Sequence, residues 1–241
     1  MRKILAAMHR TAGKGYITWH ERALLPLVYM FIYMKWFNLL EDMHPTHYYV
    51  MHSMIDDHIP FVEWFVIPYY TWFLYVFFTT AFLVLLPRSE DFYRAMFFMF
   101  IGMTFFLVFS TFVPTAQPLR PDVMPRDNMC TRLILRLYRQ DTPTNVFPSI
   151  HVFNSIACMI ALLKSRALDD HRLVRAASCV LSAAVILSTM FIKQHSVIDV
   201  AGAFVLAVIA YRFAYQSDFI LELMHIRERE SAVPQHITLF G

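Results

Sequence analysis

His195 and Asp199 have residue types and a spacing that suit nucleophilic or acid–base chemistry. They are four residues apart where an apolar run begins, so on a helix they share one face, one turn apart. A carboxylate that accepts one ring N–H of an imidazole leaves the other ring nitrogen free as a nucleophile or base. The alternative is a structural aspartate beside a histidine at a membrane border. Ionisable groups within membrane spans are costly and usually functional, so we treat the pair as a candidate catalytic unit.

His151 opens a second candidate unit, because the residues before it, Pro148, Ser149 and Ile150, are typical of a helix start. Proline suits the first position of a helix, where its missing N–H costs nothing. The N–H groups of the next residues would then have no partner within the helix. Helix N-termini bind phosphate. We therefore expect an anion site formed by the N–H groups of Ser149, Ile150 and His151, with the imidazole at its edge.

Two further side chains would complete this site. Arg120 lies near the start of the long connection 114–147, and connections of this length tend to be functional. Ser188 lies less than two turns before the end of the apolar run that precedes His195. Two imidazoles, a carboxylate, hydroxyl groups, a guanidinium and a helix N-terminus would then meet at one end of the fold. Packing alone does not readily explain that combination.

The composition indicates that the scaffold for these residues is a membrane protein. Of 241 residues, 58% are hydrophobic and 16% are charged, against roughly 25% charged residues in soluble domains. The mean hydropathy is +0.46. The net charge of +3 and the lack of a basic run with interleaved aromatic residues argue against nucleic acid as a partner. Three cysteines without a C-x-x-C pair form no disulfide framework.

Six apolar runs are long enough to cross a bilayer. Lipid admits only helices or closed barrels, and period-2 alternation is absent, so we expect an all-α fold, a polytopic six-transmembrane-helix bundle. The fourth run is short and should be tucked among the others. The predicted domain is 23–216, between an N-terminal interfacial segment, 1–22, and a C-terminal cytosolic tail, 217–241. The six predicted spans are 23–40, 61–86, 92–113, 148–163, 173–192 and 197–215.

The distribution of Lys and Arg predicts that both termini are cytosolic. That orientation leaves 14 of the 21 basic residues in cytosolic segments and six in outer segments. The candidate site then lies on the extracytoplasmic side of a cell membrane. The absence of an extended tail and of N-glycosylation signals favours a bacterial inner membrane. Five arginines of the predicted outer segments fall in 114–147, where they could bind an anion. Three of them, Arg132, Arg136 and Arg139, recur at helical spacing, which favours a solvated basic face of a surface helix.

The first outer loop, 41–60, has two interpretations. Its four histidines and the adjacent Asp56 and Asp57 suggest a metal site, but their spacing matches no metal-binding motif. Tyrosine, methionine and isoleucine residues alternate with the polar ones, which favours an amphipathic segment lying on the outer surface. We therefore expect no metal here. The polar residues concerned are His44, His47, His52, Asp56, Asp57 and His58.

Three segments resemble, in order and spacing, the motifs of the type 2 phosphatidic acid phosphatase superfamily of membrane enzymes. The resemblance covers residues 113–202, and the six-span layout extends it to nearly the whole chain. Leu119-Arg120-Pro121 resembles the end of the K-x6-R-P motif, Pro148-Ser149-Ile150-His151 resembles P-S-G-H, and Ser188-x6-His195-x3-Asp199 resembles S-R-x5-H-x3-D.

The resemblance implies a membrane lipid phosphatase that needs no metal or cofactor and cleaves a lipid phosphate monoester or diphosphate. His195, oriented by Asp199, would attack phosphorus and form a phosphohistidine, and His151 would serve as general acid and then base. The expected partners are the lipid phosphate substrate and membrane lipids. The groups that would hold the phosphate oxygens belong to Arg120, Lys193, Ser149, Ile150 and Ser188.

Departures from the motifs leave other functions open. Val113 and Thr189 stand where the family has a lysine and an arginine, and Ile150 replaces a glycine. Lys193 or an arginine of the second outer loop could supply a missing charge. The run 141–151, Asp-x-Pro-x-Asn-x-Phe-Pro-Ser-x-His, resembles the branch that includes inositol phosphorylceramide synthases, which would make the reaction a transfer to an alcohol. A non-enzymatic lipid-binding or transport protein is the third possibility.

Overall fold

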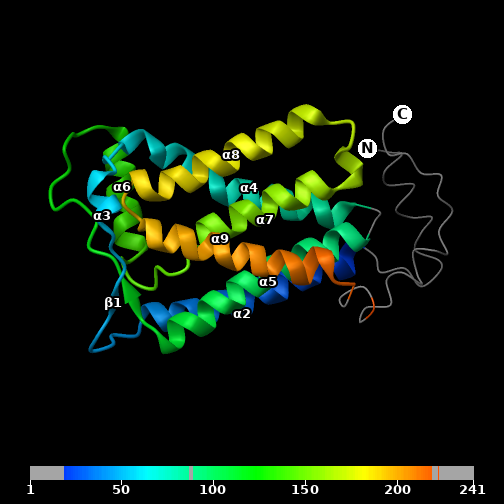
Figure 1. Ribbon diagram of the computed structural model, residues 1–241, viewed down its shortest axis with the longest axis horizontal. Coiled ribbons are helices and arrows are strands. Elements are labelled where there is room, and N and C mark those ends of the chain that lie inside the picture. The colour runs from blue at the N-terminus through cyan, green and yellow to red at the C-terminus, as the bar shows by residue number, and fades with distance from the viewer. Residues whose placement is uncertain (1–18, 87–88, 219–221, 223–241) are drawn as a thin grey trace.

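A computed structural model describes residues 19–86, 89–218 and 222. Six long helices lie side by side along the longest axis (Figure 1). The predicted interfacial segment falls outside the described residues except for 19–22, which belong to the first long helix, and the predicted tail is described only at 217, 218 and 222. The long helices are α2 (Trp19–Glu41), α4 (Val66–Leu85), α5 (Ser89–Phe112), α7 (Ile150–Lys164), α8 (Arg172–Phe191) and α9 (Val197–Tyr211).

Short elements occupy the connections, mostly at one end of the bundle. A one-turn 3-10 helix, η1, precedes α4, and a π-helical segment, η3, continues α9. Helix α2 begins and η3 ends at the opposite end from α3, α6 and β1 (Figure 1). The short elements are β1 (Tyr49–Val50), α3 (Met54–His58), η1 (Glu63–Phe65), β2 (Thr115–Ala116), α6 (Met129–Gln140), η2 (Arg166–Leu168) and η3 (Arg212–Gln216).

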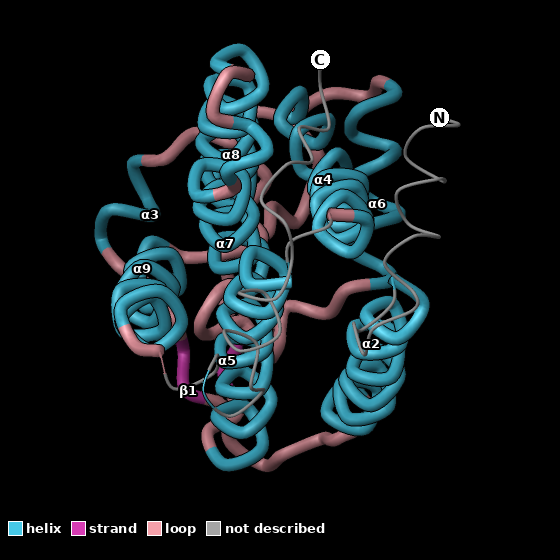
Figure 2. The backbone as a smooth tube through the Cα atoms, turned by 90° about the vertical axis from the view of Figure 1, so that its right-hand side faces the viewer, coloured by secondary structure: helices cyan, strands magenta, loops and turns pink. Residues whose placement is uncertain are grey.

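Five of these helices are long and apolar enough to cross a membrane, so the predicted count of six is not confirmed. The predicted fourth span is α7, and its 15 residues extend only about 22 Å, less than the roughly 30 Å of a bilayer core. Most of its side chains are buried. Helix α7 packs against α4, α5, α8 and α9, and Figure 2 shows it between α5 and α8. The short apolar run is therefore a central helix, as its length suggested.

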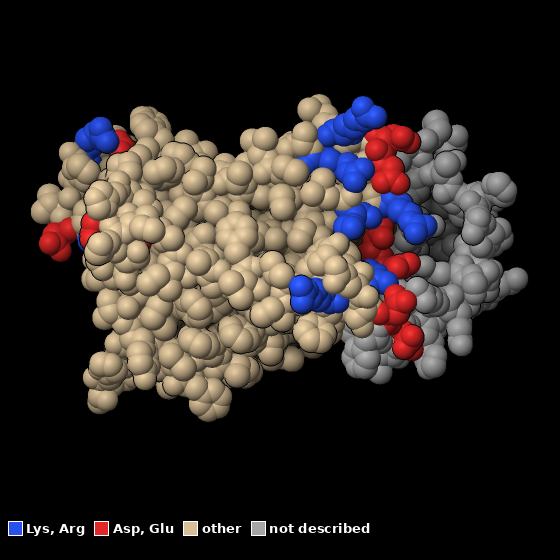
Figure 3. Space-filling view, viewed as in Figure 1, with Lys and Arg blue, Asp and Glu red and all other residues tan. Residues whose placement is uncertain are grey.

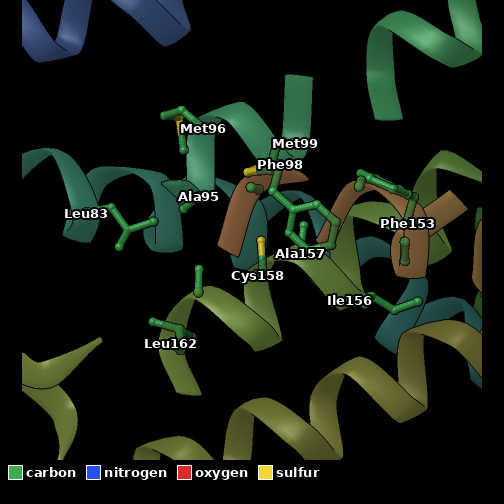
Figure 4. Close-up of a cluster of buried hydrophobic side chains, with 14 of the residues drawn as sticks. Leu83, Ala95, Met96, Phe98, Met99, Phe153, Ile156, Ala157, Cys158 and Leu162 are labelled. Atoms are coloured by element: carbon green, nitrogen blue, oxygen red, sulfur yellow. The ribbon is translucent and has the colours of Figure 1, made fainter. Parts of the chain in front are cut away.

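The apolar core surrounds α7 and joins it to α4, α5 and α9 (Figure 4). Phe153 of α7 is fully buried and packs on α5, where a side chain in place of Gly102 would lie 2.1 Å from its ring. A second cluster joins α2, α5 and Ile150. Because Ile150 belongs to this cluster, the first residue of α7 is anchored by packing.

Hydroxyl groups link the helices inside the apolar region. The Tyr75 hydroxyl lies 2.5 Å from Ser178 Oγ and 3.1 Å from Ser182 Oγ, which joins α4 to α8. Ser182 in turn donates to the carbonyl oxygen of Ser155 on α7 at 3.0 Å. Small hydroxyl residues let helices approach closely in membranes and satisfy one another's polar groups. These bonds hold three helices of the bundle in register below the candidate site.

The end of the bundle that carries α3 and α6 differs from the all-α prediction by one two-stranded parallel sheet in the described residues. Tyr49 pairs with Thr115 and Val50 with Ala116, so the first outer loop is joined to the second. Two-residue strands are too short to produce a periodic pattern in the sequence. The basic residues of α6 are exposed on its outer face, which confirms the solvated basic face predicted for Arg132, Arg136 and Arg139.

Candidate active site

Helix α9 begins with the residues that hold His195. Ser196 caps the helix, and its hydroxyl oxygen accepts the N–H of Ile198 at 3.1 Å. Asp199 Oδ2 accepts the N–H of Ser196 at 2.9 Å and faces His195 Nδ1 at 3.3 Å. The Asp199 side chain is fully buried. The carboxylate therefore favours the Nδ1–H tautomer and leaves Nε2 of His195 as the free ring nitrogen. The predicted contact between the two side chains is present, but His195 lies two residues before α9, so the capped start of the helix and not a shared helix face brings the pair together.

A tight turn after α8 sets the position of His195. The carbonyl oxygen of Thr189 accepts the N–H groups of Gln194 at 2.9 Å and of His195 at 3.0 Å. Lys193 adopts a left-handed backbone conformation with φ 55°, which reverses the chain between the two helices. The Thr189 hydroxyl donates to the carbonyl of Ile186 at 2.7 Å. Thr189, at the position of a motif arginine, thus helps to build the turn through its backbone.

Helix α7 begins two residues later than the sequence suggested. Ser149 is its cap, with Oγ accepting the N–H of Val152 at 3.4 Å, so Pro148 lies before the cap and not at the first helical position. The N–H of Ser149 donates to the carbonyl of Asp199 at 3.2 Å and is not free for an anion. Ile150 and His151 hold the first helical positions, where N–H groups have no partner within the helix. The predicted anion site is therefore reduced to these two N–H groups.

The start of α7 is held against α9 by close packing. Phe147 lies on α9 at Gly202, where any Cβ would be 2.3 Å from its ring. The small glycine lets the chain before α7 approach α9 closely, next to Asp199. The consequence is that His151 and His195 face each other, with ring centroids 5.7 Å apart and the planes at 55°. Two imidazoles at this separation can both reach the substituents of one phosphorus atom.

Aromatic side chains of α4 form a wall on one side of His151. The ring centroids of Tyr69, Trp72 and Phe73 lie 4.6, 4.4 and 6.5 Å from that of His151. Their spacing of three and four residues puts them on one helix face. Trp72 Nε1 is buried and has no hydrogen-bond partner among the described residues. Sequence reasoning missed this wall, because an aromatic stripe in an apolar span has the same appearance as ordinary packing.

Arg120 bonds to Gln194, the residue before His195, and is fixed by three acceptors. It donates to the carbonyls of Tyr138 at 3.1 Å and Asp141 at 2.7 Å, and to Gln194 Oε1 at 2.6 Å. The guanidinium also lies 4.2 Å from the centroid of the Tyr138 ring. Its Nε is buried without a partner among the described residues. Burial lowers the pKa of Arg120, while the Asp141 carboxylate opposes that change.

Asp141 brings a carboxylate into the same network, which sequence reasoning also missed. Its Oδ2 accepts Gln194 Nε2 at 2.9 Å and the Tyr69 hydroxyl at 3.3 Å. Gln194 therefore bridges Arg120 at one end of its amide and Asp141 at the other. Burial raises the pKa of Asp141, and the nearby His195 and Arg120 lower it in part. The 141–151 run gave the only signal, since it begins at this aspartate.

Three predicted phosphate ligands have other partners. Lys193 Nζ donates to the carbonyls of Asp56 at 2.8 Å and Ile59 at 2.6 Å, and burial lowers its pKa. The Ser188 hydroxyl is fully buried and donates to the carbonyl of Val185, one turn earlier, at 2.6 Å. Ile150 can contribute its N–H, while its side chain belongs to the core. A role for Lys193 and Ser188 on phosphate stays a prediction.

The first outer loop contributes a carboxylate to α9, again without a sequence signal. Asp56 is 2% exposed, and its two oxygens accept the Ser196 hydroxyl at 2.6 Å and the Val197 N–H at 2.8 Å. The N–H of Ser53 donates to the same carboxylate at 2.8 Å. A negative charge is favourable at a helix N-terminus. Asp56 therefore completes the cap beside His195.

The histidines of the first outer loop do not gather into a metal site. Across residues 19–86, 89–218 and 222, no group of three or more His, Cys, Asp or Glu side chains could hold a metal ion. His52 pairs with Asp57 at 2.8 Å, and His58 Nδ1 lies 2.8 Å from the Met54 carbonyl. Met54 and Ile55 are exposed on α3. The described loop thus has the exposed apolar residues of the amphipathic interpretation.

One comparison with known proteins gave a match. A family model described as the PAP2 superfamily matches residues 41–213, which is more than half of the chain and includes every residue of the site. No curated protein and no solved structure matches the chain.

Proposed function

Because the chain belongs to the PAP2 superfamily, which generally comprises phosphatases, we propose that it is a metal-independent membrane phosphatase acting on a lipid phosphate monoester or diphosphate through a phosphohistidine. The observation that carries the proposal is the His151–His195–Asp199 arrangement at one end of an apolar bundle. The imidazoles are 5.7 Å apart, and a buried carboxylate orients one of them.

The first step cleaves the ester bond. Nε2 of His195 attacks phosphorus, a P–N bond forms, and the bond to the leaving lipid oxygen breaks. His151, protonated, gives its proton to that oxygen, so the lipid leaves as an alcohol. Asp199 accepts Nδ1–H throughout and stabilises the positive charge that develops on the His195 ring.

The second step releases phosphate. His151, now neutral, takes a proton from water, and the resulting oxygen attacks phosphorus as the P–N bond breaks. The charge on the non-bridging oxygens is stabilised by donors that lack partners in the described structure, Arg120 Nε and the N–H groups of Ile150 and His151. The Ser149 hydroxyl accepts Val152 N–H and can still donate its own proton.

A phosphotransferase is the second candidate, with a lipid or polyol hydroxyl in place of water in the second step. It is favoured by the 141–151 run, whose first residue lies in the Gln194 network beside His195. Incubation with a lipid carrying labelled phosphate separates the two reactions. Free labelled phosphate supports the hydrolase, and labelled phosphate esterified to the acceptor alcohol supports the transferase.

The nucleophile is tested by His195→Ala and His151→Ala in purified, detergent-solubilised protein. We expect His195→Ala to abolish both turnover and acid-labile labelling of the protein by a phosphate-labelled lipid. His151→Ala should slow the loss of a preformed label, because the water-activating base is gone. A chelator should change neither reaction. Turnover by folded His195→Ala at the wild-type rate would refute the assignment, and loss of activity with chelator would return the histidine-rich loop to consideration.

A further inference from the structure

The Asp141 carboxylate lies beside the candidate active site without a cation bonded to it. Its hydrogen bonds come from two neutral donors, the Gln194 amide and the Tyr69 hydroxyl. Arg120 binds the backbone carbonyl of Asp141 and not its carboxylate. In the part of the chain that the structure describes, no lysine or arginine forms an ion pair with this carboxylate. Neutral donors do not cancel the negative charge of this carboxylate, so the charge acts on neighbouring groups, including a bound substrate.

Each of the two neutral donors is adjacent to one of the imidazoles. Gln194 precedes His195 in the chain, and the Tyr69 ring lies 4.6 Å from the His151 ring. The charged and titratable groups that act on Asp141 are His195, Arg120, Glu41 and Tyr69. A phosphate held between the imidazoles would therefore meet the field of Asp141.

The charges around this position allow one anionic charge and not two. Arg120 is the cation of the network, and Asp141 offsets it. The proton that His151 carries into the first step is then the one positive charge of the site without a counter-charge among the described residues. The Asp199 carboxylate is already directed at His195. The Lys193 ammonium donates to backbone carbonyls of the first outer loop. The remaining outer arginines of α6 point to solvent. A second negative charge on the substrate would face Asp141 in a poorly hydrated site, where like charges repel strongly.

We infer that the site selects a lipid phosphate that carries a single negative charge, and that Asp141 is the residue that rejects the second charge. This inference rests on the proposed function and narrows its substrate class, because a lipid diphosphate carries more than one negative charge and would be excluded. Two chemical forms meet the condition. A phosphodiester carries one charge at all physiological pH values, and a phosphate monoester carries one charge only when protonated, below a second pKa of about 6.

The wild-type enzyme can be tested with two lipids that share one leaving group. One is a diacylglycerol phosphate monoester, and the other is its methyl phosphodiester, and both assays count released diacylglycerol. Taking the ratio of kcat/KM for the two lipids removes effects of the enzyme's own titration. We expect kcat/KM for the monoester, relative to the diester, to fall roughly 50-fold from pH 6 to pH 8, following its singly charged fraction. If the diester is not cleaved, the pH profile of wild type is compared with that of Asp141→Asn, in which the fall in monoester kcat/KM from pH 6 to pH 8 should be much smaller.

Asp141→Asn supplies the second arm, because it keeps the shape and an oxygen acceptor while removing the charge. At pH 8 we expect its kcat/KM for the monoester to rise about tenfold or more over wild type, with the diester changed much less. Asp127→Asn is the matched control, since Asp127 is an exposed outer carboxylate paired with Arg132. It should behave as wild type with both lipids.

Three results would overturn the inference. The first is a monoester preference that persists or increases from pH 6 to pH 8 in wild type, which needs no variant. The second is an Asp141→Asn enzyme that loses activity on both lipids by the same factor, as a purely structural role requires. The third is an absence of turnover and of His195 labelling with both lipids, which would remove the proposed function as well. Turnover with a dianion preference would remove only the inference about charge.

Discussion

Arg120 combines two tasks that are usually separate. Two of its bonds go to the backbone of the second outer loop and one goes to the side chain of Gln194, which precedes His195. Its Nε has no partner in the described structure although it is buried. An unpaired buried donor costs free energy unless something binds it. Three acceptors therefore fix the plane of the Arg120 guanidinium, and its buried Nε is the donor that we propose binds the substrate.

Arg120→Lys should separate these tasks at the residue scale. A lysine keeps the positive charge but cannot hold three acceptors in a plane or present Nε to phosphate. We expect kcat/KM for lipid phosphate to fall on the order of a hundredfold, as for loss of one charge-stabilising donor. Inorganic phosphate, used as a competitive inhibitor, should bind more weakly by a similar factor. Arg132→Lys, on the exposed face of α6, is the control and should leave both quantities unchanged.

The residue scale is also where the sequence was most and least informative. The four-residue spacing of His195 and Asp199 correctly predicted their contact, although His195 lies just before α9 and the carboxylate reaches it from the first turn of that helix. Spacing does not specify where a long side chain ends. Lys193 stands two residues from His195, yet its left-handed backbone directs the ammonium to the first outer loop. The short Ser188 hydroxyl bonds back to its own helix.

At the scale of elements, hydrogen bonds join the first outer loop to the start of α9, and we call this set of contacts the clamp. Asp56 receives bonds from Ser196 and Val197, and Lys193 returns bonds to the carbonyls of Asp56 and Ile59. These contacts join residues more than 130 positions apart. The clamp encloses the short segment that contains His195. Asp56 does not touch the imidazole, so we regard it as a positioning residue.

Asp56→Asn should test the clamp. The amide keeps one oxygen acceptor, so one of the two bonds to α9 can persist, but the charge at the helix N-terminus and the second acceptor are lost. We expect kcat to fall about tenfold or more with little change in KM, because His195 would be oriented less well while phosphate donors remain. Asp57→Asn is the neighbouring control, since Asp57 is exposed and pairs with His52.

A purely structural role for Asp56 predicts a different pattern. The melting temperature of the detergent-solubilised protein would fall, while kcat per folded molecule and the pH at which the His195 label forms would match wild type. That result would contradict the positioning role. Glutamate at position 56 offers a rescue test, because it restores the charge with a longer reach and should recover part of kcat.

The elements themselves were predictable in proportion to their length. All five long apolar helices fall on predicted spans, because about 20 apolar residues are a strong signal. The two-residue strands and the five-residue helix α3 fall below any periodic signal. The π-helical continuation of α9 over Arg212–Gln216 lies within the predicted sixth span, whose hydropathy does not distinguish helix types.

At the scale of the whole molecule, charged side chains lie at the two ends of the bundle, and an uncharged belt lies between them. On the face shown in Figure 3, charged side chains gather at the end where α2 begins, and a broad uncharged zone separates them from the few at the opposite end. Exposed large apolar residues occupy α2, α4, α8 and α9 along this zone. The belt fits a bilayer. His151 and His195 stand at the starts of α7 and α9, and α9 begins at the end of the bundle that carries α3 and α6. The orientation of that end follows only from the count of basic residues.

The orientation can be measured by cysteine labelling in intact cells. The native Cys130, Cys158 and Cys179 are first replaced by alanine, and a single cysteine is then added at Asp127 or at Asp170. Asp127 is exposed before α6, at the site's end, and Asp170 is exposed between η2 and α8, at the other end. Because basic residues favour the cytosolic side, we expect a membrane-impermeant maleimide to label Asp127→Cys in intact cells and Asp170→Cys only after lysis. The reverse pattern would put the site on the cytosolic face, where its substrate would have to come from the inner leaflet.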